Sequence, residues 1–94
     1  MKKYIDSFSK LNNIEKALIL ASWLKTNANI SEVNEHTIFS ALKTVGYSTS
    51  FDIKSSLTNG KNKKNYFTAG STAGFYMIHH IGEDHIRELE EARG

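Results

Sequence analysis

The sequence contains neither cysteine nor proline, and it has no long apolar run. Without cysteine there is no disulfide framework, no cysteine-based zinc site and no thiol chemistry. The longest apolar run covers only residues 17–21, whereas roughly 20 apolar residues are needed to cross a bilayer. The basic start, Met1-Lys2-Lys3, is not followed by the apolar core of a signal peptide. We therefore expect a cytoplasmic protein with no membrane contact.

Length and composition indicate one folded domain. The 94 residues are 39% hydrophobic and 23% charged, which is an ordinary globular mixture. No repeat, low-complexity tract or long linker divides the chain. We expect a single domain over residues 1–94, whose turns are formed by Gly, Asn and Ser because proline is absent.

Charge is unevenly distributed although the net charge is only +2. Residues 53–82 contain no Asp or Glu, whereas most of the charged residues after Gly82 are acidic. The carboxylate-free region carries four lysines, at Lys54, Lys61, Lys63 and Lys64. This pattern predicts one basic region and an acidic tail.

The first two predicted helices differ in how much apolar surface they carry. Tyr4, Ile5, Phe8 and Leu11 recur at helical spacing, so residues 1–11 are a candidate extra helix. A small core has little room to cover this stripe, and we expect it to be a homodimer surface. A longer helix begins after Asn12, which forms a capping-box pattern with Glu15, and ends within residues 27–29. This helix is apolar on most of its faces, which predicts a place at the centre of the core.

Two further helices follow. Residues 30–33 could be extended, after which Asn34 is a suitable N-cap and Gly46 a suitable helix terminator. The stretch from Thr49 to Asp52 matches the start pattern of a third helix, which we expect to end at the turn-forming dipeptide Asn59-Gly60.

The rest of the chain changes to strand-like periodicity. Residues 65–69 and 75–80 are rich in aromatic, Thr and Ile residues, and 70–74 form a loop of hairpin length. A last helix is predicted over 83–92. The expected fold is α+β: a three-helix core, a two-stranded β-hairpin wing, and flanking N- and C-terminal helices. Its predicted core contains Leu18, Leu20, Ile38, Leu42, Ile53, Leu57 and Ile78.

The order of elements and residues 75–89, FYMIHHIGEDHIREL, carry a family resemblance. Over about residues 13–91 the chain resembles the winged helix-turn-helix superfamily. In the common ending of that family an aromatic-x-Leu-Thr strand runs into a Gly and a helix. Tyr76 and Ile78 match the aromatic and Leu positions and Gly82 the Gly, whereas His79 replaces the Thr. The resemblance implies a bacterial or phage-type transcription regulator, or a module of a mobile-element or defence protein.

A winged helix-turn-helix places its third core helix in the major groove of double-stranded DNA. With Ile53 and Leu57 inward, the outer residues of that helix would contact bases, and the following lysines would contact phosphates. The candidate DNA-binding residues are Phe51, Lys54, Ser55, Thr58, Asn59, Lys61, Lys63 and Lys64. A dimer on paired half-sites would enlarge the small footprint, through the opening or the last helix.

A protein-interaction module is the alternative function. Low net charge, the missing arginines on the third helix and the acidic tail favour it, with Phe51 as a partner anchor. We expect no enzyme activity, cofactor or metal, because no nucleophile is paired with a base and no spacing matches a zinc site. His79 and His80 would point to opposite faces of a strand.

Overall fold

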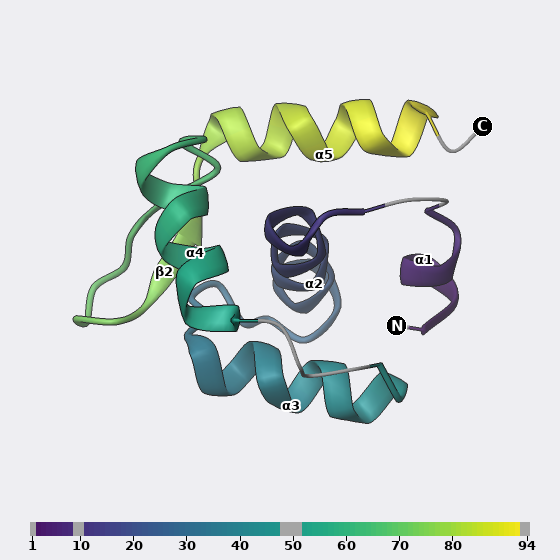
Figure 1. The fold of residues 1–94 in the computed structure, drawn as a ribbon, viewed down its shortest axis with the longest axis horizontal. Coiled ribbons are helices and arrows are strands. Elements are labelled where there is room, and N and C mark those ends of the chain that lie inside the picture. Colours follow the sequence, from purple (N-terminus) through teal and green to yellow (C-terminus); the bar gives the residue numbers. More distant parts are fainter. Residues whose placement is uncertain (1, 9–10, 48–51, 93–94) are drawn as a thin grey trace.

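The structure is a computed structural model that describes residues 2–8, 11–47 and 52–92. Its elements are α1 (Lys2–Asp6), α2 (Asn13–Asn27), α3 (Glu35–Val45), α4 (Ile53–Asn62), β1 (Phe67–Ala69), β2 (Tyr76–Ile78) and α5 (His80–Ala92). Viewed end-on, α2 is surrounded by α3, α5, α1, and α4 with the hairpin (Figure 1). The predicted α+β class is therefore confirmed. No helix in the described residues has the length and apolar character to cross a membrane.

The central position of α2 follows from its sequence. The Glu15 amide donates to Asn12 Oδ1 at 2.8 Å and the Asn12 amide donates to Glu15 Oε1 at 3.0 Å, so the predicted capping box is present. Residues 17–21 are at most 2% exposed. A helix buried on nearly all sides needs no polar face, which explains its continuous apolar segment.

The opening helix packs on the core of its own chain. Ile5 is 5% exposed and Phe8 is 9% exposed, and the Tyr4 hydroxyl donates to Glu90 of α5 at 3.0 Å. The expectation that this stripe stays uncovered in a monomer is therefore wrong. Because this stripe is covered, the reason for assigning a dimer surface to the opening helix no longer holds. α1 itself is short and ends at Asp6.

α3 has the predicted ends. The Thr37 amide donates to Asn34 Oδ1 at 2.9 Å, and Gly46 adopts the left-handed conformation with φ 77°. The Tyr47 amide donates to the Leu42 carbonyl at 3.0 Å, the bond that closes a Schellman-type helix ending.

α4 differs from the prediction at both ends. Its N-cap is Asp52, whereas Thr49 lies outside the described residues. The helix continues through Gly60, where the sequence suggests a turn, and ends at Asn62. Gly60 does not supply a positive φ; instead its missing side chain makes room for Phe67, whose ring would lie 2.8 Å from a Cβ atom there. The glycine is required for close packing of β1, not for a turn.

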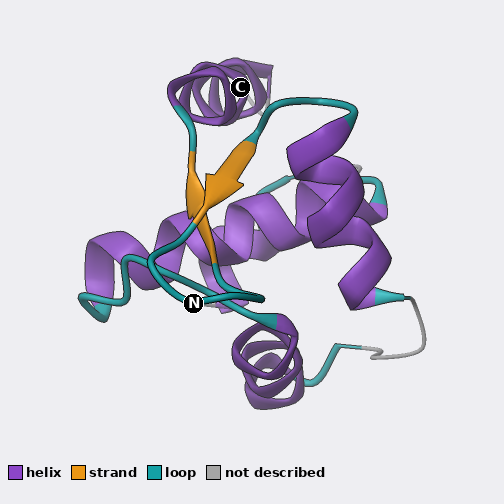
Figure 2. Cartoon of the chain, turned by 90° about the vertical axis from the view of Figure 1, so that its left-hand side faces the viewer, coloured by secondary structure: helices purple, strands orange, loops and turns teal. Residues whose placement is uncertain are grey.

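The hairpin is shorter than predicted. β1 and β2 are antiparallel, with Phe67 opposite Ile78 and Ala69 opposite Tyr76. Asn65 has φ 58°, which interrupts extended backbone just before β1. Within the predicted extended segment, Val33 forms a bridge with Tyr76 on the other edge of β2, so the hairpin is tied to the α2–α3 connection. Figure 2 shows the hairpin crossing α2 between α3 and α5.

α5 begins at His80, three residues earlier than predicted. The His79 ring accepts the Ile81 amide at Nδ1 over 3.3 Å, and the His79 carbonyl accepts the Glu83 amide at 3.0 Å. His79 thereby acts as the N-cap of α5. The histidine is thus compatible with the helix start that follows it.

The predicted core is confirmed for six of its seven residues. Ile78 is only partly buried and packs against the core cluster. Val33 and Phe67 join the core in addition, each 2% exposed. The confirmed members are Leu18, Leu20, Ile38, Leu42, Ile53 and Leu57.

Candidate nucleic-acid interface

One side of α4 packs on the protein and the other side is open. Ile53, Ser56, Leu57 and Gly60 are buried against neighbouring elements, among them α2, α3 and β1. This confirms the predicted inward direction of Ile53 and Leu57. The remaining candidates on α4 are exposed or partly exposed: Lys54, Ser55, Thr58, Asn59 and Lys61. Phe51 lies outside the described residues.

The two lysines after α4 are exposed, as a phosphate contact requires. The amides of Lys63 and Lys64 donate to the Asn59 carbonyl at 2.8 and 3.3 Å. These bonds tie the backbone of both lysines to the last turn of α4. Lys61 belongs to the helix, where its ammonium donates to Asn62 Oδ1 at 3.3 Å.

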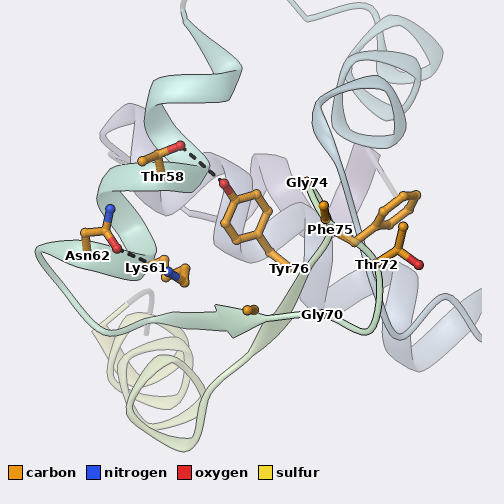
Figure 3. A pocket seen from close by; sticks show the side chains of 10 residues that line it. Thr58, Lys61, Asn62, Gly70, Thr72, Gly74, Phe75 and Tyr76 are labelled. Atoms are coloured by element: carbon orange, nitrogen blue, oxygen red, sulfur yellow. Dashed lines mark hydrogen bonds between the residues drawn. The ribbon is translucent and has the colours of Figure 1, made fainter.

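An open pocket of about 200 Å³ lies between the last two turns of α4 and the hairpin with its loop (Figure 3). The Tyr76 ring points from β2 towards α4, where its hydroxyl lies 3.3 Å from Thr58 Oγ1. Lys61 and Asn62 border the same pocket, opposite the glycine-rich hairpin loop. Hydroxyl, amide and ammonium groups therefore face one space, and none of the described residues that line it carries a carboxylate. Such a donor-rich surface can bind an oxyanion.

Ser55 has a structural role at the start of α4. Its amide donates to Asp52 Oδ1 at 2.9 Å and its hydroxyl donates to Asp52 Oδ2 at 2.8 Å. These bonds, led by the one from the Ser55 amide, lower the pKa of the Asp52 carboxyl. The hydroxyl of Ser55 would have to leave this cap before it could donate to a base.

Folding also brings carboxylates to the region that is free of them in the sequence. Glu32, in the α2–α3 connection, accepts bonds from the Ser71 amide at 3.0 Å and the Ser71 hydroxyl at 2.8 Å. Glu35 borders a second pocket of about 280 Å³ together with Lys54. Neither Glu32 nor Glu35 is among the site residues predicted from the sequence. Glu32 and Ser71 are 39 positions apart, and no local pattern connects them.

The histidines do not lie where strand alternation predicts. The rings of His79 and His80 are 4.1 Å apart, so they do not point to opposite faces. The reason is that β2 ends at Ile78 and α5 begins at His80. Within residues 2–8, 11–47 and 52–92, no three His, Asp or Glu side chains form a group that could hold a metal ion.

His85 lies in a separate contact between α2 and α5. Its Nε2 is 2.8 Å from Glu15 Oε2, and its ring stacks on Tyr66 with centroids 4.6 Å apart. Burial, together with Glu15 and Glu88, raises the pKa of the Tyr66 phenol. This cluster fixes α5 against the first turn of α2.

Comparisons with family models, with curated proteins and with solved structures found no match to this chain.

Proposed function

We propose that this chain is a winged helix-turn-helix protein that binds double-stranded DNA and acts as a small transcription regulator. The observation that carries the proposal is the open side of α4, which borders a donor-rich pocket together with the hairpin and is followed by two exposed lysines. The element order α3, α4, β1, β2 agrees with a helix-turn-helix followed by a wing. In this proposal α4 enters the major groove and the hairpin lies beside the backbone.

The proposed contacts divide into two chemical kinds. Lys61, Lys63 and Lys64 contact phosphates, which contributes affinity without sequence information. Thr58 and Asn59 are the candidates for base contacts, since hydroxyl and amide groups pair with base edges. Ser55 is a weaker candidate, because its hydroxyl already donates to Asp52.

The test is fluorescence anisotropy with a preferred duplex, selected from a random library, and with random duplexes at several salt concentrations. Each phosphate contact removed by Lys61→Gln, Lys63→Gln or Lys64→Gln should reduce the salt slope by about one unit on all sequences. Asn59→Ala should cost about 1–3 kcal/mol on the preferred site and little on random DNA. Lys25→Gln is the matched control, because Lys25 pairs with Glu83 of α5 at 3.2 Å, outside the α4 surface. Its salt slope should equal that of the unmodified chain.

Absence of binding at low salt would contradict the proposal and favour the protein-interaction alternative. Phe39, Met77 and Ile81 are then the first candidate anchors, since each large apolar side chain is 38–40% exposed.

Two copies on paired half-sites are also part of the DNA proposal. α5 is the remaining candidate surface for that pairing, and light scattering with and without DNA tests it.

A further inference from the structure

The tip of the hairpin presents hydrogen-bond donors that are occupied by a carboxylate of the same chain. The amide and the hydroxyl of Ser71 both donate to Glu32, at 3.0 Å and 2.8 Å. Gly70 permits this approach, because a Cβ atom there would lie 2.6 Å from Glu32 Oε1. A backbone amide and a hydroxyl that bind a carboxylate are also suited to bind a phosphate oxygen.

We propose that Glu32 is an internal competitor that blocks a phosphate-binding site at the hairpin tip. The inference rests on the proposed DNA binding. When a DNA phosphate approaches the hairpin, the Glu32 carboxylate opposes it in two ways. It keeps the two Ser71 donors engaged, and its negative charge repels the phosphate. Glu32 thus limits the affinity that the hairpin contributes.

Two variants at Glu32 separate these effects. Glu32→Gln removes the charge but retains an oxygen that can accept the Ser71 bonds, whereas Glu32→Ala removes the charge and frees both donors. Glu35→Gln is the matched control, since Glu35 lies near Lys54 beside α4 and is not the acceptor of the Ser71 bonds. The probe is a labelled random-sequence duplex, titrated with the full chain at low and at high salt.

We expect Glu32→Ala to bind about tenfold more tightly than the unmodified chain, as expected for a freed hydrogen bond to a charged group. Glu32→Gln and Glu35→Gln should both give a smaller gain that disappears at high salt, because it comes from charge alone. The excess gain of Glu32→Ala should persist at high salt. Adding Ser71→Ala to Glu32→Ala should remove part of that excess, because one donor is lost.

Several results would overturn this inference while leaving DNA binding intact. If Glu32→Ala binds as the unmodified chain does, or more weakly, then Glu32 only positions the hairpin. If its gain equals that of Glu35→Gln at every salt concentration, then charge alone acts and no site is blocked. If the unmodified chain binds no duplex at low salt, the proposed function itself fails. Circular dichroism and thermal melting of each variant establish that it is folded when binding is measured.

Discussion

Gly82 is the position at which the structure makes its sharpest prediction about stability. The residue is buried in the first turn of α5. A Cβ atom on it would lie 2.2 Å from the Tyr66 carbonyl oxygen and 2.9 Å from the carbonyl carbon. That carbonyl also accepts the His79 amide at 2.9 Å, just before α5. An added methyl group therefore meets backbone that is already held in place.

The expected cost of Gly82→Ala follows from two opposing effects. Alanine is favoured over glycine inside a helix by about 1 kcal/mol. Forcing a methyl group into a packed site costs about 3 kcal/mol at the upper end of the usual range, appropriate here because the obstructing atoms are backbone. The net loss should be about 2 kcal/mol. For a domain of this size, that loss corresponds to a decrease in Tm of roughly 8–16 °C.

Urea denaturation followed by circular dichroism measures this loss, and thermal melting gives the change in Tm. Asp84→Ala is the control in the same helix, because Asp84 is exposed and its ion pair with Arg87, at 3.3 Å, is exposed as well. It should change stability by no more than about 0.5 kcal/mol. If Gly82→Ala is as stable as the unmodified chain or more stable, the close approach of α5 to Tyr66 is wrong.

Three further predictions concern the core, the α5 cap and pH. Leu57→Ala should lower the free energy of unfolding in urea by about 2–5 kcal/mol, since Leu57 is 1% exposed. Ile78→Ala should cost less because Ile78 is only partly buried, and equal costs would contradict this core. His79→Ala should lower the free energy of unfolding by about 0.5–2 kcal/mol in the same assay, and His79→Asn should restore most of this loss, because asparagine is a good N-cap. No loss in His79→Ala would show that His79 does not cap α5. The lowered pKa of Asp52 stabilises the fold above the ordinary aspartate pKa, and this contribution disappears as the pH falls through the lowered value. Asp52→Asn should flatten that part of the acid denaturation curve, and an unchanged curve would exclude the cap as its source.

Part of the candidate site could be predicted because it depends on local periodicity. Ile53 and Leu57 are four residues apart, so burying them turns the lysine, threonine and asparagine side of α4 outwards. The position at which α4 ends, and therefore the length of its exposed side, could not be predicted. The sequence predicts that this helix ends at Asn59-Gly60, but the helix continues to Asn62. The structure shows that the glycine at position 60 makes room for the Phe67 ring and does not form a turn.

Local sequence patterns were enough to predict the starts of α2 and α3, the apolar centre and the α+β class, because caps and periodicity act over three or four residues. Asn12 with Glu15 and Asn34 with Thr37 are such local contacts, and all of them were readable in the chain. Tertiary structure alone decided which distant groups meet. Ile5 and Phe8 are buried against the core of their own chain, although the sequence predicts a core too small to cover them. Glu32 reached Ser71 because the α2–α3 connection pairs with β2, and such long-range pairing leaves no local pattern in the sequence.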